Sequence, residues 1–344
     1  MSYDVVVVGG GIGGLTVAAL LSARGVKTCL LERNSQVGGC VARVEFGGHD
    51  FEPGMGLYTS FGPGEIYDRI FSELPVDVPE TSLLAGNDNF YSIRGGPATV
   101  AERLAESIKK SGGTLRLNSP VLRLAYDETG QRAIGVDLLS GETVLARKAI
   151  VSNLTIWDTY GKLIGLNRTP LETKKLLKTL QGFGAYVVYA SLEEAALDRL
   201  PSEHFTMAGF TVAISPPGSG PPGKRAVTLK TDTDPMDWFA FQASEEEYEE
   251  RDQSALEDFW ARLHTALPTL GSDIEIIETA NPRTYYDSTR RKLGMVLGVN
   301  RSSEVITHRT NLPNVFMVGD TVIPEARMDA VVESALSLAN QLTK

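Results

Sequence analysis

The sequence predicts an α/β fold that begins with a Rossmann-like parallel βαβ unit. Four consecutive valines at residues 5–8 form an apolar run that glycines follow, which is typical of a strand buried on both faces of a parallel sheet. A helical stretch with small side chains follows over residues 15–22, and a second apolar strand is predicted at residues 26–31. The order strand, glycines, helix and strand is the one from which parallel sheets are built.

The glycines between the first strand and the helix have the spacing of a dinucleotide-binding loop. Gly9, Gly11 and Gly14 match the three glycines of the G-x-G-x-x-G fingerprint. Ile12 and Gly13 lie between the second and the third. The first glycine permits a tight turn, the second lets a pyrophosphate approach the backbone, and the third lets the helix pack close to the strand. Because free N–H groups at the helix start point at phosphates, we place all five residues in a cofactor-binding site.

An acidic residue ends the second predicted strand. Glu32 lies eighteen residues after Gly14, where a carboxylate accepts hydrogen bonds from the ribose hydroxyls of a dinucleotide. A carboxylate at this place argues against a 2′-phosphate on that ribose. Arg33 follows directly and is included in the predicted site. The whole series of strand, glycines, helix, strand and acid is far more specific than the glycines alone.

Two further motifs favour non-covalent FAD over NAD as the cofactor. Gly38 and Gly39 follow shortly after Glu32, and they let a second loop pass close to the pyrophosphate. Near the C-terminus, Gly319 and Asp320 follow an apolar run, so that the carboxylate can accept a hydrogen bond from a ribityl hydroxyl. We expect no separate nicotinamide domain.

These motifs resemble those of the flavoprotein superfamily that contains phytoene desaturases, carotenoid isomerases, retinol saturases and amine oxidases. The resemblance covers about residues 1–56, 90–155 and 280–344. It implies a glutathione-reductase-type FAD domain joined to a substrate domain made of a mixed sheet and helices. It also implies further cofactor contacts, which are expected at Gly54, Val121, Asn153, Met328, Asp329 and Ala330.

The resemblance also suggests how the chain divides into domains. The FAD-binding domain is predicted to comprise residues 1–57, 90–158 and 278–344, and the substrate domain residues 58–89 and 159–277. Larger members of the superfamily carry a long helical cap where this chain has only a short and irregular stretch. Either a second copy of the chain or the proline-rich loop at residues 215–223 can supply the missing wall. We expect a homodimer, and a substrate smaller or more polar than a full carotene.

Three residues are candidates for a catalytic role: Arg327, Tyr285 and Tyr58. Arg327 precedes the last predicted helix, where it can stabilise anionic flavin or hold a substrate carboxylate. Asp329 is predicted to be the N-cap of that helix. A flavin amine oxidase would instead need an aromatic cage, for which Tyr58, Tyr285 and Tyr286 are candidates.

Composition excludes several classes of partner. The chain has 344 residues, which is enough for two domains, and its net charge of −10 disfavours nucleic acid and anionic membranes. No apolar run is long enough for a transmembrane helix, and the first strand starts too early for a signal peptide. Two cysteines and four scattered histidines predict a reduced, cytoplasmic protein without a metal site.

The function predicted from these observations is FAD-dependent oxidoreduction. The sequence contains no Ser/His/Asp set and no phosphate-transfer motif, so the flavin would carry the reaction. We expect it to act on C–C or C=C bonds of an apolar, conjugated or carboxylate-bearing small molecule. A flavin amine oxidase and a non-catalytic binding protein on the same fold are the alternatives.

Overall fold

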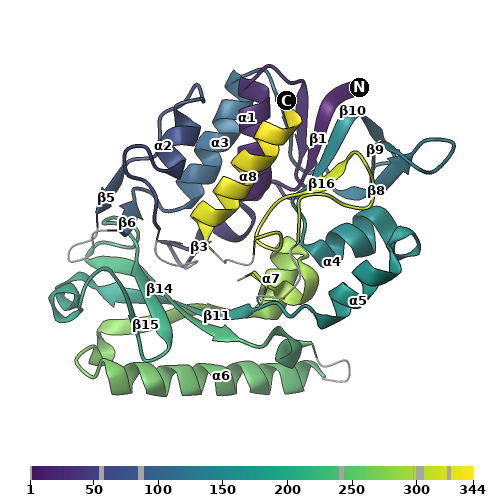
Figure 1. Ribbon diagram of the computed structural model, residues 1–344. Coiled ribbons are helices and arrows are strands. Elements are labelled where there is room, and N and C mark those ends of the chain that lie inside the picture. The colour runs from purple at the N-terminus through teal and green to yellow at the C-terminus, as the bar shows by residue number, and fades with distance from the viewer. Residues whose placement is uncertain are drawn as a thin grey trace.

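Two β-sheets organise the molecule. The computed structural model describes residues 2–53, 58–83, 89–239, 244–296, 298–299, 306–323 and 327–344. In Figure 1 the larger sheet and its helices form the upper half, and a second sheet lies below them, above a long helix. Both chain ends lie at the top of the upper half, away from the second sheet.

The larger sheet confirms the predicted Rossmann-like unit. Its strands are β1 (Ser2–Val8), β2 (Thr28–Leu31), β7 (Thr114–Arg116), β8 (Val121–Tyr126), β9 (Ala133–Leu138), β10 (Thr143–Ser152) and β16 (Val315–Met317). Their order is β7-β2-β1-β10-β9-β8, with β16 paired to β10. The central pairs are parallel, whereas the first residues of β10 pair antiparallel with β9. The carboxyl ends of β2, β1, β10 and β16 therefore lie along one edge, where ligands bind in such sheets.

Three helices cover one face of this sheet, as Figure 1 shows: α1 (Ile12–Ala23), α3 (Ala98–Lys110) and α8 (Met328–Leu342). The helix α1 packs against both of the others and is buried from Ile12 to Ser22. Its side chains are almost all apolar or small, because a helix that is enclosed on all sides has no face to offer to water. Ala18 and Ala19 let the neighbouring helices come close.

The opposite face is covered by helical turns that follow β10. They are α4 (Ile156–Asp158), the π-helical turn η2 (Thr159–Gly165), η3 (Leu166–Arg168) and α5 (Leu171–Thr179). Ile156, Trp157 and Leu163 are buried in the same core cluster as Val6 and Ile150 of the sheet. This packing associates residues 156–180 with the larger sheet. The boundaries of the FAD-binding and substrate domains given in the sequence analysis remain predictions.

The second sheet is antiparallel, with the order β12-β13-β14-β11-β15. Its strands are β11 (Gly184–Glu193), β12 (His204–Met207), β13 (Phe210–Ile214), β14 (Lys224–Thr233) and β15 (Ile274–Ala280). The strand β11, which lies between β14 and β15, is buried along almost its whole length because both of its faces are covered. Tyr186 and Val188 point to a core beneath the sheet, and Ala185 and Val187 to a core with Phe51 above it. Alternate residues of a strand point to opposite faces, which explains why the sequence here is continuously apolar.

The long helix α6 (Glu245–Ala266) closes the underside of the second sheet. Ser244 and Glu247 form a capping box at its start, each accepting a hydrogen bond from a backbone N–H of the other. Phe259 and Leu263 are fully buried against the sheet. Most of the remaining residues are exposed, and acidic side chains are frequent among them.

The shorter elements connect these layers. They are η1 (Gly39–Val41), β3 (Val44–Phe46), β4 (His49–Phe51), α2 (Ile66–Phe71), β5 (Thr81–Leu83), β6 (Tyr91–Ile93), η4 (Glu194–Arg199), η5 (Pro235–Trp238), η6 (Gly271–Asp273), α7 (Pro282–Thr289) and η7 (Lys292–Gly294).

Two helices lie where the sequence analysis expected none. Residues 58–89, which were expected to be irregular in place of a helical cap, contain α2. Tyr67 and Ile70 of this helix are fully buried near α8. The prolines on either side concealed its helical spacing of apolar residues. The other helix, α7, starts at Pro282 after Asn281, whose side chain accepts hydrogen bonds from the next turn. An Asn-Pro pair at a helix start is a signal that could have predicted it.

Candidate cofactor-binding site

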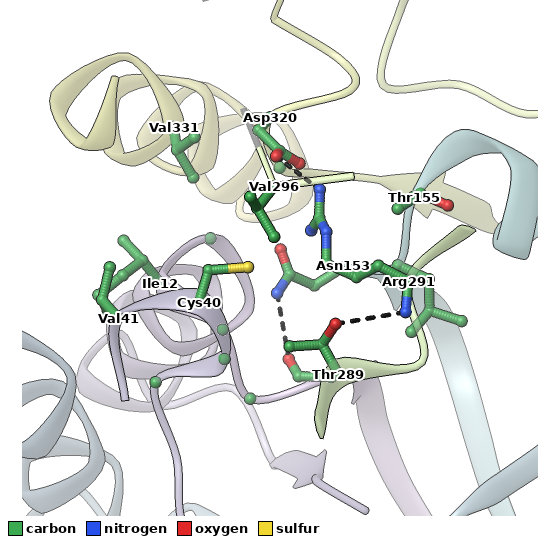
Figure 2. A pocket seen from close by; sticks show the side chains of 18 of the residues that line it. Ile12, Cys40, Val41, Asn153, Thr155, Thr289, Arg291, Val296, Asp320 and Val331 are labelled. Atoms are coloured by element: carbon green, nitrogen blue, oxygen red, sulfur yellow. Dashed lines mark hydrogen bonds and ion pairs between the residues drawn. The ribbon is translucent and has the colours of Figure 1, made fainter. Parts of the chain in front are cut away.

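A cavity of about 750 Å³ lies at the carboxyl ends of β1, β2, β10 and β16. It falls within the 300–1,000 Å³ typical of cofactor sites. Many of the residues predicted from the sequence line it together: Gly9, Gly11, Ile12, Gly13, Glu32, Arg33, Gly38, Gly39, Tyr58, Val121, Asn153, Gly319, Asp320, Arg327 and Met328. They come from segments that are far apart in the chain, and Figure 2 shows several of them facing one hollow.

The first glycine loop has no space for larger residues. Gly9 has φ +101°, which L side chains rarely adopt. A Cβ atom at Gly13 would lie 2.7 Å from Oδ1 of Asn153, and one at Gly14 only 2.2 Å from the Gly9 carbonyl oxygen. The helix α1 follows Gly11, which has no side chain to satisfy the first N–H groups. These donors remain available for a phosphate.

The second glycine pair lies directly against the first loop. The N–H of Gly38 donates to the Gly10 carbonyl oxygen over 2.8 Å. A Cβ atom at Gly39 would approach the Cα of Gly11 to 3.3 Å. The sequence argument that both loops approach one pyrophosphate therefore agrees with their contact in the structure.

Asn153 joins three of the loops that build the site. It follows β10, and its side chain lies between Gly11, Gly13 and Gly319. Its amide Nδ2 lies 3.5 Å from the carbonyl oxygen of Gly9, a long hydrogen bond. The predicted role of Asn153 thus includes a structural part, because it packs against the loops that follow β1 and β16.

Glu32 holds the two loops on either side of it. One carboxylate oxygen accepts from the Gly10 N–H over 2.6 Å, and the other from the Asn34 N–H over 2.8 Å. Each oxygen keeps a further lone pair for a ribose hydroxyl. The position of Glu32 in the cavity wall fits the predicted ribose contact.

The charge of the cavity differs from that of the whole chain, which carries −10. Among the described residues, the cationic side chains of its wall are Arg33, Lys162, Arg290, Arg291 and Arg327, and the carboxylates are Glu32, Asp158 and Asp320. Cations thus outnumber carboxylates in an otherwise acidic protein. A dianionic pyrophosphate between neutral glycine loops fits such a wall. The residues present therefore fit FAD.

Arg291 is the principal site residue that the sequence analysis missed. Its Nη2 donates to Oδ2 of Asp320 over 2.6 Å, and its Nε donates to the Met295 carbonyl oxygen, also over 2.6 Å. Burial would lower the pKa of Arg291, but Asp320 and Cys40 outweigh it and raise the pKa further above its ordinary value. The guanidinium is therefore permanently charged. Arg291 lies beyond the end of a helix that was not predicted, so nothing indicated that it faces the site.

Arg327 lines the cavity but is paired with Asp329, by bonds of 3.1 Å and 2.6 Å. The prediction that Asp329 is the N-cap of α8 is wrong, because the N-cap is Arg327 and Asp329 lies in the first turn. Asp329 instead accepts hydrogen bonds from the hydroxyls of Thr59 and Ser60, at 2.8 Å and 2.9 Å. It connects α8 to the segment that carries Tyr58.

The candidate tyrosines lie in different environments. Tyr58 lines the cavity, and burial, followed by Glu52, raises its pKa well above the ordinary value. Tyr285 is buried in the core with Phe51 and is not among the wall residues, and neither is Tyr286. Burial, followed by Tyr189 and Cys40, raises the pKa of Tyr285 as well. The described wall therefore does not contain the predicted group of three tyrosines.

The other predicted cofactor contacts lie outside the described wall. Gly14 is buried within α1 behind the glycine loop, and Asp329 and Ala330 are buried in the first turn of α8. Gly54 lies outside the described residues. The loop at residues 215–223, which was considered as a lid, lines a separate cavity of about 280 Å³ beside Glu52.

The fold and this site together define a two-sheet, dinucleotide-binding flavoprotein. Comparison with known families agrees: a model of the NAD(P)-binding Rossmann-like domain matches residues 7–74, and the model of flavin containing amine oxidoreductases matches residues 66–343. The chain belongs to the flavin containing amine oxidoreductase family, and FAD is its cofactor. The predicted superfamily is thereby confirmed.

Individual relatives are distant. Prolycopene isomerase 2, chloroplastic, from an Oncidium hybrid cultivar is 24% identical over 270 residues, which are 72% of this chain and 45% of the isomerase. An oxidoreductase from Methanosarcina mazei superposes with a TM-score of 0.73 and 15% identity, covering 99% of this chain and 100% of the other. Cyclohexylamine oxidase from Brevibacterium oxydans gives 0.68 and 14%, with coverage of 99% and 98%. The two structural matches show the fold alone.

The described residues contain neither a membrane-spanning helix nor a metal-binding cluster. None of the helices described is long and apolar enough to cross a membrane. Within the same residues, no three His, Cys, Asp or Glu side chains are grouped so that they could hold a metal ion.

Proposed function

We propose that the chain is an oxidoreductase that uses FAD to act on C–C or C=C bonds of an apolar small molecule, conjugated or bearing a carboxylate. The wall of the cavity beyond the glycine loops is the observation that carries this proposal. It contains Val41, Tyr58, Phe90 and Val296, with the guanidinium of Arg327 beside them. Apolar side chains suit a hydrocarbon, and a guanidinium suits a carboxylate. The similarity to a prolycopene isomerase supports the same substrate class.

Each part of the site has a task in this proposal. FAD supplies the exchange of hydride with the substrate. The glycine loops and the start of α1 bind its pyrophosphate, while Glu32 and Asp320 accept hydrogen bonds from its ribose and ribityl hydroxyls. Tyr58 is protonated at neutral pH like any tyrosine, and burial, followed by Glu52, raises its pKa further, so it can donate a hydrogen bond at the wall. The apolar residues exclude water from the reacting atoms.

Amine oxidation is the second candidate, and the family to which the chain belongs favours it. One observation favours the first candidate over amine oxidation. An amine oxidase would need an aromatic cage, and neither Tyr285 nor Tyr286 is among the wall residues. A non-catalytic binding protein is supported least, since it would not need the steric features of the glycine loops at Gly13 and Gly14.

Anaerobic bleaching of the flavin tests the proposal. The FAD-loaded protein is mixed under argon with three panels at equal concentrations: conjugated polyenes, unsaturated carboxylic acids, and primary amines. We expect a polyene or an unsaturated acid to change the flavin spectrum, and the amines to have no effect. Bleaching by amines alone would establish the second candidate. A colourless protein that takes up no FAD would overturn both.

The oligomeric state of the protein and its cellular compartment are also proposals. We propose a homodimer in the cytoplasm, in which the second copy completes the wall of the cavity. Light scattering of the FAD-loaded protein measures its mass directly. A monomer at micromolar concentration would contradict the dimer.

A further inference from the structure

A buried ion pair crosses the wall of the cofactor cavity. Arg291 enters from the turn after α7, and Figure 2 shows its side chain extending to Asp320. The distance from Nη2 to Oδ2 is 2.6 Å, and the two side chains are only 17% and 18% exposed. The Met295 carbonyl oxygen fixes the same guanidinium at Nε. The positive charge is thus held in place beside the carboxylate and is poorly screened by water.

Asp320 brings this pair next to the cofactor. It follows Gly319, whose φ of +121° turns the chain at the end of the sheet, and both residues line the cavity. The carboxylate suits a ribityl hydroxyl, and this contact would bring the flavin end of the cofactor to the same side of the site. A lone carboxylate there would oppose the negative charge that a flavin gains on reduction.

We propose that Arg291 sets the reduction potential of the bound FAD by cancelling the charge of Asp320. The inference rests on the cavity holding FAD, as the proposed function requires, but it needs no substrate. Asp320 serves as a hydrogen-bond acceptor for the cofactor, and Arg291 removes the electrostatic disadvantage of that acceptor. Arg291 is therefore a positioning and charge-compensating residue and has no part in the transfer of hydride.

Cys40 lies in the same wall, close enough to feel both charges, and therefore offers a second place at which to test them. Burial raises the pKa of Cys40; Arg291 acts to lower it and Asp320 to raise it. The fields of the two groups therefore oppose each other at a third point of the cavity. Figure 2 shows the sulfur of Cys40 directed toward the interior of the site.

Arg327 offers a matched comparison at the same cavity. It is also paired with an aspartate, but its side chain is 60% exposed, whereas that of Arg291 is 17% exposed. Water screens the charge of an exposed guanidinium much more strongly. Loss of Arg327 should therefore change the potential less than loss of Arg291.

The experiment measures the midpoint potential of FAD at saturating cofactor, by slow anaerobic reduction against a reference dye. In Arg291→Met, the preference for reduced over oxidised FAD should fall at least tenfold, a shift of about 30 mV for a two-electron couple. Arg291→Lys, which keeps the positive charge, should have a midpoint potential close to that of the wild type. The double variant Arg291→Met with Asp320→Asn should also return toward the wild-type potential, because both charges are gone.

Several results would overturn the proposal. One is a wild-type potential in Arg291→Met, even if FAD binding or stability is reduced, since that would leave Arg291 with a structural role only. Others are a double variant with a potential as low as that of the single variant, and an equally large shift in Arg327→Met.

Titration of Cys40 in the cofactor-free protein gives a second readout. Its pKa should rise in Arg291→Met and fall in Asp320→Asn, and unchanged values in both would contradict the opposing fields. If no compound bleaches the flavin while these shifts occur, the proposed function fails and the role of Arg291 stands.

Discussion

Arg327 and Asp329 form a two-point ion pair at the start of α8, with Nε 3.1 Å from Oδ1 and Nη2 2.6 Å from Oδ2. The carboxylate also accepts hydrogen bonds from Thr59 and Ser60. The last helix is thereby attached to the segment that places Tyr58 in the cavity wall. Arg327, which the sequence suggested for chemistry, thus also helps to hold the wall together through Asp329.

Asp329 should make stability depend on pH. Burial would raise its pKa, but the hydrogen bonds from Arg327, Thr59 and Ser60 outweigh it and keep the pKa below its ordinary value. A lowered folded-state pKa stabilises the protein above the unfolded value of about 4, and this contribution is lost as the pH falls below it. Urea unfolding at pH 6 and pH 3 should therefore show a smaller loss on acidification for Asp329→Asn than for wild type. Thr59→Val, which removes one donor, should lie between them, and equal acid losses in all three would contradict the account.

Glu32 should contribute to FAD binding through its carboxylate. Glu32→Ala should weaken binding more than Glu32→Gln, because hydrogen bonds to a charged group contribute about 1.5–3 kcal/mol and glutamine retains one acceptor oxygen. Flavin titration by fluorescence measures the affinities. Equal affinities in wild type and both variants would remove Glu32 from the site.

Gly14 should tolerate no side chain. The Cβ atom of Gly14→Ala would lie 2.2 Å from a backbone oxygen, so the free energy of unfolding should fall by roughly 1–3 kcal/mol or more. Gly161→Ala is the matched control, since a Cβ atom there meets nothing within 4 Å. It should leave stability unchanged or raise it by about 0.5–1 kcal/mol, as alanine does within helices. Equal effects of the two substitutions, measured by urea unfolding, would contradict the close packing of the loop.

The two cysteines should differ in their reaction with thiol reagents. Burial raises the pKa of Cys29 to about 11, and its side chain is inaccessible, so it should react only after unfolding. Cys40 lines the cavity and should react slowly in the cofactor-free protein. FAD should protect Cys40 further, as mass spectrometry of alkylated peptides would show. Unchanged labelling of Cys40 with and without FAD would mean that the cofactor does not cover it.

The sequence predicted the larger sheet and its glycine loops well, because their chemistry is local. Gly9, Gly11 and Glu32 lie within one βαβ unit, so their spacing alone specifies where they meet. Arg291 could not be found in this way. It reaches Asp320 only through the fold of α7 and the turn that follows, and a surface arginine would look the same in the sequence.

The role of Asp329 was misjudged for a related reason. Local statistics make an aspartate near a helix start a probable N-cap. Its actual partners include Thr59 and Ser60, about 270 positions earlier in the chain. Only the tertiary packing of α8 against that segment reveals the carboxylate as a tertiary link, in addition to its pair with the neighbouring Arg327.

The hydrogen bonds of Glu32 have a consequence for the energetics of ribose binding. Since Gly10 and Asn34 already donate to this carboxylate, folding itself arranges the two loops that the ribose will meet. The cofactor then finds an ordered receptor and does not have to spend its own interaction energy on loop entropy.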